Sequence, residues 1–454
     1  RGGRRPHGTG RPTVAKDLTS HRPVAHSLAE IESQLSKLWA RAAAAQVVAA
    51  RAEAAVVAAQ AEAAARSAAS LAASLAAAQE AGGEVGNHVV ARTSVLNLVV
   101  LAGDEGTAEH CAAIIASTAS RHASRSLILS AADPDGEPGL EASVEALALT
   151  TAAGRSETGA ETIYIRACGE TGRHLASIIV PLLVHDLPVA LWWPNDPPFD
   201  SHRAERLLPL ADRLIIDGSA WSGNGLDILA QLAATAESRH LVAVDWALLR
   251  QSRWREAVAS VYDLPDLRPH LGAVRRIDVD YATDDPGDPA GNTNVVRPLY
   301  HVAWLASRLG MTVHEPLRRQ PDGRRVATLR QRNHQVEVVL QPDGSELASG
   351  STVRVVITSR IRGTDLVGEV TAGDRNVEVT VRDCGRDRIK RTYLAPRLND
   401  VDLLSLSIQE NAADPVSVQA LAMVHRLLGV ESGSRKGADS SWSRRTSIRS
   451  QDGD

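Results

Sequence analysis

Apolar residues in the middle of the chain alternate between two patterns. Short, near-continuous apolar runs are typical of strands buried on both faces of a sheet. Between these runs, apolar residues recur at a period of about 3.6, which is typical of helices. The expected strands are 95–101, 127–130, 162–166, 187–192, 213–217 and 241–245, and the expected helices are 107–122, 172–184, 202–210 and 226–237. This alternation predicts right-handed crossovers and an α/β fold with a Rossmann-like, doubly wound, mainly parallel sheet.

The pattern changes after residue 250. Helices are expected at 253–261 and from Leu299 to Gly310, with a strand at 274–281 and an Asp-, Pro- and Gly-rich loop at 284–294 between them. Strands separated by short turns follow, and a last helix at 415–428 is closed by Gly429. The expected strands are 336–341, 352–361, 365–371, 376–383 and 388–394. They predict an α+β domain with an antiparallel meander.

The two ends of the chain differ from its middle. We expect a disordered lead at 1–26, which is basic and Gly-rich, and a disordered tail at 431–454, which has little apolar surface. A helical, Ala-rich segment is expected over 27–86, since Ala is the strongest helix former and dominates 42–80. The predicted division is therefore 1–26, 27–86, an α/β domain at 87–250, an α+β domain at 251–430, and 431–454.

Composition excludes several classes of function. Arg and Lys number 50 against 54 Asp and Glu, a formal charge of −4, so no basic field favours nucleic acid. Cys111, Cys168 and Cys384 lack the spacing of a metal site or a disulfide framework, so we expect no metal and a reducing, cytoplasmic location. No run of about 18 uncharged apolar residues is present, so no membrane span is expected.

Motifs for catalysis or cofactor binding are not apparent. The first strand–helix turn, Ala102–Thr107, carries two acidic residues and matches neither dinucleotide-binding nor phosphate-loop motifs, so no cofactor is expected. Its acids are expected to cap the helix. Asp133, Asp217 and Asp245 follow strands, where α/β enzymes place their sites and where Asp also serves in turns and caps. No catalytic residues are therefore assigned. The alternative is a sugar-phosphate- or nucleotide-binding enzyme that uses Asp133, Asp217 and Arg125.

Trp and Arg stand out instead, and both are enriched at protein–protein interfaces. Trp192 and Trp193 end a strand before a Pro-fixed loop. Trp246, Arg250 and Trp254 have the spacing i, i+4, i+8, which aligns them if the segment is helical. The structural alternatives to partner binding are that Trp192 and Trp193 pack in two different core layers, and that Arg stacks on Trp within the domain. The candidate partner-binding residues are Arg125, Trp192, Trp193, Asn195, Trp246, Arg250, Arg253 and Trp254.

Several segments resemble the OpcA family of glucose-6-phosphate dehydrogenase assembly proteins. They are Thr93–Ala102, Arg121–Ser126, Pro181–Pro194, Ala211–Asp217, Val244–Arg250 with Trp254–Glu256, and Ala303–Gly310. The resemblance implies a non-catalytic partner that binds glucose-6-phosphate dehydrogenase, promotes its active oligomer and supports the oxidative pentose phosphate pathway. The chain departs from the family in its Ala-rich stretch, in Ala123 where Pro is usual, and in Ala160 where the family's cysteine is expected. A scaffold acting through the Ala-rich helix is a further hypothesis.

Overall fold

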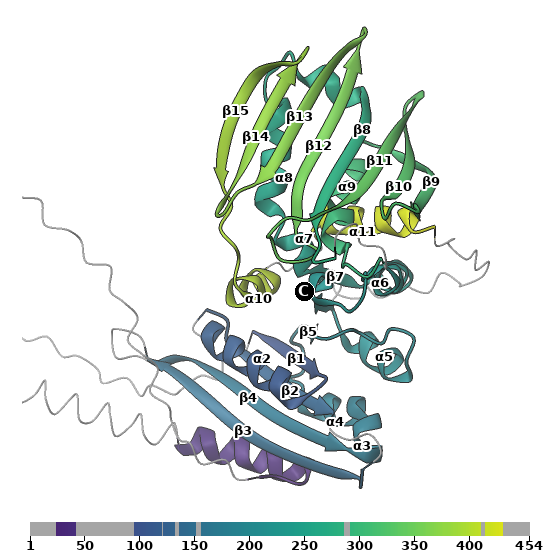
Figure 1. The fold of residues 1–454 in the computed structure, drawn as a ribbon. Helices are drawn as coiled ribbons and strands as arrows, with labels where there is room; N and C mark the ends of the chain where they lie inside the picture. The colour runs from purple at the N-terminus through teal and green to yellow at the C-terminus, as the bar shows by residue number, and fades with distance from the viewer. Residues whose placement is uncertain are drawn as a thin grey trace, which may run out of the picture.

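A computed structural model describes residues 24–41, 95–119, 121–131, 136–150, 156–285, 291–409 and 414–429. Two sheets, each flanked by helices, make up the fold (Figure 1). Residues 1–23 of the expected lead, most of the Ala-rich segment, Asp133 and the expected tail lie outside the described residues. The expectation of disorder is wrong at the end of the lead, because Ala25 is buried and pairs with Ala142 of the first sheet through two backbone hydrogen bonds. No helix within the described ranges is long and apolar enough to cross a membrane.

The first sheet has seven strands in the order β3-β4-β2-β1-β5-β6-β7. Every neighbouring pair is parallel except β3 and β4, which form an antiparallel hairpin at one edge. Without β3, this order matches the 3-2-1-4-5-6 order of dinucleotide-binding Rossmann folds. The strands are β1 (Leu96–Ala102), β2 (Ser124–Ala131), β3 (Gly139–Thr150), β4 (Ser156–Cys168), β5 (Val189–Trp193), β6 (Arg213–Ile216) and β7 (Val242–Asp245). The predicted α/β class is confirmed, and β3 is an addition to it.

Helices cover both faces of this sheet. Helix α2 and helix α10 bury one face, and α4, α5 and the helical residues 28–41 pack on the other. The helix expected at 172–184 is instead two helices, because the backbone at His174 leaves the helical conformation. The helices are α2 (Glu105–Thr118), α3 (Gly169–Arg173), α4 (Leu175–Leu182), α5 (His202–Leu207), α6 (Leu226–Arg239) and α10 (Asp400–Gln409).

The second sheet has eight strands in the order β15-β14-β13-β12-β8-β11-β10-β9. The predicted meander is present from β12 to β15, but β11 is not part of it. Strand β8 lies between β11 and β12 and pairs with β11 in parallel. The strands are β8 (Val274–Ala282), β9 (Thr312–Arg319), β10 (Arg325–Gln331), β11 (His334–Asp343), β12 (Thr352–Ile361), β13 (Thr364–Ala372), β14 (Asn376–Asp383) and β15 (Arg386–Leu394).

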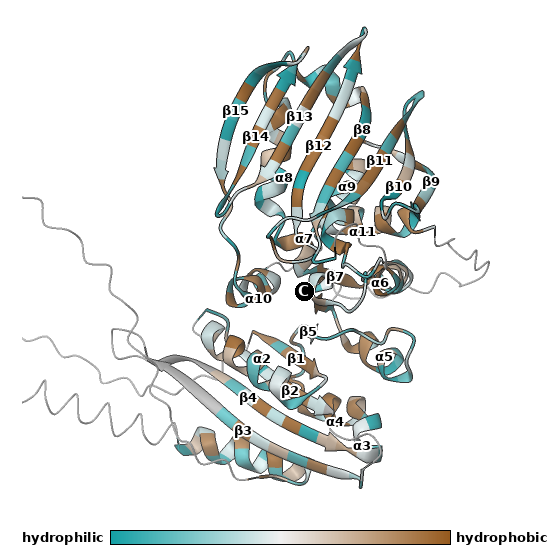
Figure 2. Ribbon diagram, viewed as in Figure 1, coloured by the Kyte–Doolittle hydropathy of each residue, from teal (hydrophilic) through white to brown (hydrophobic). Residues whose placement is uncertain are grey.

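The two faces of the second sheet differ in chemistry. Helices α8 (Ser252–Ala259) and α9 (Val296–Arg308) pack behind it in Figure 1 and bury its Val, Ile and Leu residues. The other face carries ion pairs, and Figure 2 shows the resulting alternation of hydrophilic and hydrophobic residues along the strands. Arg354, for example, bonds Asp280 at 3.1 Å and Glu369 at 2.5 Å. This period-2 pattern is expected for a sheet with one covered face.

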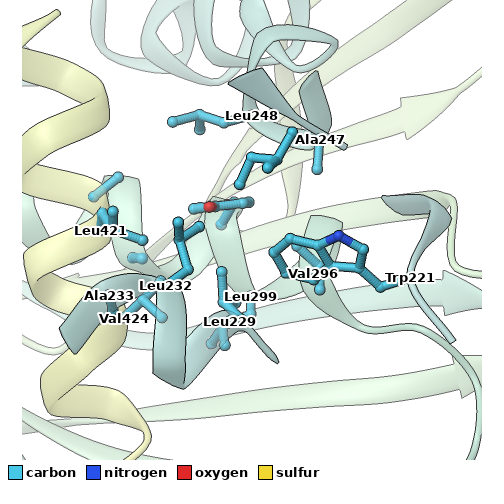
Figure 3. Close-up of a cluster of buried hydrophobic side chains, with 14 of the residues drawn as sticks. Trp221, Leu229, Leu232, Ala233, Ala247, Leu248, Val296, Leu299, Leu421 and Val424 are labelled. Atoms are coloured by element: carbon cyan, nitrogen blue, oxygen red, sulfur yellow. The ribbon is translucent and has the colours of Figure 1, made fainter. Parts of the chain in front are cut away.

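One continuous apolar core joins the two halves of the molecule. Helices α6, α9, α7 (Trp246–Leu249) and α11 (Pro415–Leu427) meet between the sheets. Figure 3 shows their interlocking side chains, which include Leu232 from α6, Leu299 from α9 and Val424 from α11. This packing fixes α9, which carries site residues, against the carboxyl end of the first sheet.

Candidate functional site

A crevice lies at the carboxyl edge of the first sheet, beside the point where the strand order reverses between β1 and β5. It has a volume of about 510 Å³ and is lined by the carboxylates of Asp104, Asp217 and Asp400 and by the rings of Trp192 and Trp246. Rossmann folds bind their ligands at this position. The lining here is acidic and aromatic, which is opposite in charge to a phosphate-binding surface.

The start of α2 is closed by side chains of this chain. Asp104 caps the helix, since its carboxylate accepts hydrogen bonds from the Thr107 amide at 2.8 Å and the Thr107 hydroxyl at 2.7 Å. These bonds lower the pKa of Asp104, so the cap is ionised at neutral pH. The amide of Gly103 donates to the Asn195 side-chain oxygen at 2.8 Å. The capping role expected of the acidic turn is confirmed for Asp104, and these two backbone donors already have acceptors.

Trp192 and Trp193 lie in different core layers. Trp192, 2% exposed, packs with α2, whereas Trp193, 4% exposed, packs on the opposite face. The ring of Trp192 packs against that of Trp246, with centroids 5.2 Å apart and the ring planes tilted by 44°. The indole nitrogen of Trp246 donates to the hydroxyl of Ser407 in α10 at 2.9 Å. In the structure these three Trp side chains therefore pack internally, as the structural alternative describes.

Arg250 links three elements at the rim of the crevice. Its guanidinium bonds Asp217, after β6, at 2.7 Å and Asp400, in α10, at 3.3 Å, and lies 5.8 Å from the ring centroid of Trp246. The predicted alignment of Trp246, Arg250 and Trp254 along one helix is interrupted. Helix α7 ends at Leu249, and a turn precedes α8. Trp254 instead packs against His301 of α9, and Arg253 is exposed and paired with Glu256.

Asp245 is buried beneath the crevice. Its carboxylate accepts from the amides of Gly218 and Ala247 and from the hydroxyl of Tyr300, each at 2.8 Å. Burial, followed by the nearby charge of Asp217, raises the pKa of Asp245 from 3.8 to about 6. The sequence indicates a capping role for Asp245. The structure adds that its hydrogen bond with Tyr300 links the end of β7 to α9.

Arg125 lies away from the crevice, at the amino end of β2. It is buried and bonds Glu161 at 2.8 Å and the Leu182 carbonyl at 2.9 Å. Because β2, β1, β5 and β6 run parallel, the start of β2 lies at the amino ends of the strands and the end of β6 lies at their carboxyl ends. Arg125 and Asp217 therefore do not form one site, and the enzyme site proposed from them with Asp133 does not assemble. The third member, Asp133, lies outside the described residues.

Metal-ligating and thiol groups are dispersed. Among the described residues, no group of three or more His, Cys, Asp or Glu side chains is placed to hold a metal ion. All three cysteines are unpaired, and burial raises the pKa of the Cys111 thiol to about 12, which keeps it protonated.

Helix α10 and the role of Asp400 were not predicted from the sequence. A helix-start signal is nevertheless present there, since Asn399 is followed by acidic residues and then by Leu403 and Leu404.

Comparisons with known proteins place the chain among relatives. It is 29% identical over 153 residues to the putative OxPP cycle protein OpcA of Synechocystis, an alignment covering 34% of this chain and 30% of the relative. It is 23% identical over 304 residues to the protein of the same name from Synechococcus elongatus, covering 64% of each. The chain thus spans less than two thirds of the length of either relative.

Similar solved structures include a putative oxidoreductase from Magnetospirillum magnetotacticum, with 13% identity and a TM-score of 0.39, covering 74% of this chain and 99% of that one. Two family models match consecutive parts of the chain. The model described as the N-terminal domain of a glucose-6-phosphate dehydrogenase subunit matches residues 115–234. The model described as the C-terminal domain of that subunit matches residues 242–421. Because the two together cover most of the chain in the expected order, this protein belongs to the OpcA family.

Proposed function

We propose that this chain is a non-catalytic partner of glucose-6-phosphate dehydrogenase, and that it acts as an assembly factor or allosteric activator of that enzyme in the oxidative pentose phosphate pathway. The observation that carries the proposal is the match of both subunit domains, in order, to this chain. The names of the two relatives, putative OxPP cycle proteins, agree with it.

The chemistry of the crevice supports a role without dinucleotide catalysis. A pyrophosphate at the start of α2 would meet the ionised carboxylate of Asp104, with Asp217 and Asp400 lining the same crevice. A second negative charge placed there would be repelled by these carboxylates. The helix terminus offers little to offset this, because Gly103 and Thr107 already donate their amides to side chains of this chain. The Rossmann strand order therefore serves here as a scaffold.

Activation requires only a difference in affinity. A protein that binds the active oligomer of a dehydrogenase more tightly than its other states shifts the population toward that oligomer. Among the candidate contact residues, Arg253 is exposed and Asn195 and Trp254 are partly exposed. We assign these three to the interface. The buried candidates, Trp192, Trp193, Trp246 and Arg125, hold the surrounding elements in place, and Arg250 cross-links them at the rim.

The test measures complex formation and dehydrogenase kinetics with the full chain. We expect co-elution with glucose-6-phosphate dehydrogenase on size-exclusion chromatography and a change in its substrate response. Arg253→Glu should weaken binding by about tenfold or more, because it reverses an exposed interface charge. Arg386→Glu, an exposed charge reversal in the β14–β15 hairpin, is the matched control and should bind normally.

Three outcomes would count against the proposal. The absence of both a complex and a kinetic effect would reject the partner. Equal binding by the two Arg variants would reject the interface but leave the partner intact. Turnover of a sugar phosphate by the purified chain alone would show that it is an enzyme.

A further inference from the structure

A second cavity lies on the other side of Arg250 from the crevice. It has a volume of about 280 Å³, is partly open to solvent, and is lined by α8, α9, the starts of β12 and β14, the end of β13 and the segment after β15. Four guanidinium groups line it, and Asp374 is the single carboxylate among its lining residues. We call it the arginine pocket, defined by Arg250, Arg253, Arg297 and Arg397.

The charges of these four arginines are unequally compensated. Arg250 has carboxylate partners toward the crevice, and Arg253 is paired with Glu256 at 2.8 Å. Arg297 instead donates to two serine hydroxyls, of Ser351 at 3.2 Å and Ser219 at 3.1 Å, and forms no ion pair with a described carboxylate. Its buried Nε atom has no hydrogen-bond partner. Arg397 is exposed and also forms no ion pair within the described chain.

Arg297 is thus a largely buried cation with other cations beside it. Burial lowers its pKa most, and repulsion from Arg250 and Arg397 lowers it further, while Asp217 and Asp245 oppose this change. Transferring a charge into a protein interior is unfavourable unless that charge is paired. An anion among Arg297, Arg250 and Arg397 would supply the missing pairing, and guanidinium groups bind the oxygens of phosphate in bidentate geometry.

Uncharged polar groups complete the wall of the pocket. His301 is fully buried, and neither of its ring nitrogens has a hydrogen-bond partner. Burial and the charge of Arg255 lower the pKa of His301 to about 3, so the neutral ring offers one donor and one acceptor. Gln251 and Thr352 are also buried, and each has an unpartnered side-chain oxygen. Since most buried polar groups are hydrogen-bonded, three such residues around one cavity indicate a polar ligand.

The aromatic part of the wall is the indole ring of Trp254, which lies against His301 with centroids 5.4 Å apart. A flat ring beside hydrogen-bonding groups suits a compound that has both C–H faces and hydroxyl groups. The pocket is slightly smaller than the ~300–1,000 Å³ typical of small-molecule sites, which favours a ligand well below the size of a dinucleotide. We propose that the arginine pocket binds a small phosphate monoester of a hydroxylated compound, with Arg297, Arg250 and Arg397 on the phosphate and His301, Gln251 and Thr352 on its hydroxyl groups.

Isothermal titration calorimetry of the full chain at low salt tests this inference. The probes are a hexose 6-phosphate, the same hexose without phosphate, and inorganic phosphate. We expect saturable 1:1 binding of the hexose 6-phosphate, weaker binding of inorganic phosphate, and none of the plain hexose. Arg397→Gln, at an exposed position without an ion pair, should weaken ester binding by about tenfold without unfolding the protein.

Two more variants sharpen the result. Arg386→Gln removes the same charge at the far end of the β14–β15 hairpin and should leave affinity unchanged. Thr352→Val should weaken binding of the ester but not of inorganic phosphate, because it removes only a neutral polar group. No saturable binding up to about 10 mM, or equal loss in the two Arg variants, overturns the site. Equal affinity for phosphate and ester overturns the metabolite assignment. The titration uses this chain alone, so its outcome is independent of the dehydrogenase partner.

Discussion

Replacement of Asp245 by Asn tests the electrostatics beneath the crevice. The carboxylate is 4% exposed, and the bonds from Gly218, Ala247 and Tyr300 only partly offset its burial, so its pKa is raised to about 6. An amide at this position keeps one oxygen for the two backbone donors, and the Tyr300 hydroxyl can turn to accept from its nitrogen. The Asp245→Asn variant should therefore fold while losing the titration.

The magnitude follows from the pKa shift. The folded protein holds this proton more tightly than the unfolded chain, in which the pKa is 3.8. The free energy of unfolding of the wild type should therefore fall as the pH rises through the window between 3.8 and about 6, and level off above it. Between about pH 4.5 and about pH 7.5 this single group accounts for a loss of about 2 kcal/mol. The Asn variant lacks this component.

Urea titrations followed by Trp fluorescence at several pH values measure the effect. The stability of Asp245→Asn minus that of the wild type should rise by about 2 kcal/mol from about pH 4.5 to about pH 7.5. The Tyr300→Phe variant is the companion, because the Tyr300 hydrogen bond lowers the pKa of Asp245. Its loss should move the pH-dependent region to higher pH. A difference between wild type and Asp245→Asn that stays constant across this range would refute the reasoning.

Three further substitutions test packing. Glu161→Gln leaves the buried Arg125 without its carboxylate and should cost about 3–5 kcal/mol of unfolding free energy in urea titrations. An unchanged free energy of unfolding would contradict this account. Leu403→Ala, in α10, should lower the free energy of unfolding by about 2–5 kcal/mol and speed amide hydrogen exchange in α10. Unchanged exchange would show that α10 does not depend on this buried side chain. Gly368→Ala should cost about 1–3 kcal/mol in thermal or urea unfolding, because its Cβ would lie 2.5 Å from Val261 Cγ1, and a neutral result would mean that Val261 moves freely.

The first sheet could be predicted because its strands are locally distinct. Buried parallel strands need apolar residues on both faces, so runs such as 95–101 stand out from the sequence. Strand β3 could not be found in this way. Residues 139–150 are rich in Ala, Glu and Leu, which favour helices, and they become extended by pairing along the whole length of β4. Tertiary pairing overrides local propensity there.

The order of the second sheet also depends on distant pairing. The short turns between β12 and β15 identify the meander locally. The insertion of β8 between β11 and β12 joins strands far apart in the chain, which period-2 patterns cannot show. Strand β9, at the edge, carries Pro316 and many polar residues, so its sequence does not resemble a buried strand.

The site was predictable only in part, for a similar reason. Adjacent residues of a strand point to opposite faces, which predicts that Trp192 and Trp193 do not share one core pocket. Whether each face of the strand is covered depends on other elements. Helix α10, which lies near the end of the chain in sequence, covers part of the Trp192–Trp246 pair. Arg297 and His301 were not predicted as site residues, because nothing in the sequence of α9 indicates that polar groups of α8 and β12 line the same cavity.

Arg250 connects the two cavities. Its guanidinium lines the arginine pocket, while its carboxylate partners, Asp217 and Asp400, line the crevice. An anion in the pocket would compete with these carboxylates for the same donors, and Asp400 belongs to α10, which covers α2 and the paired Trp rings. If an anion in the pocket draws Arg250 away from Asp400 and α10 then shifts, ligand binding in the pocket and the position of α10 would be thermodynamically linked. By reciprocity, a protein that binds preferentially to one position of α10 would then change the affinity of the pocket for its anion by the same factor.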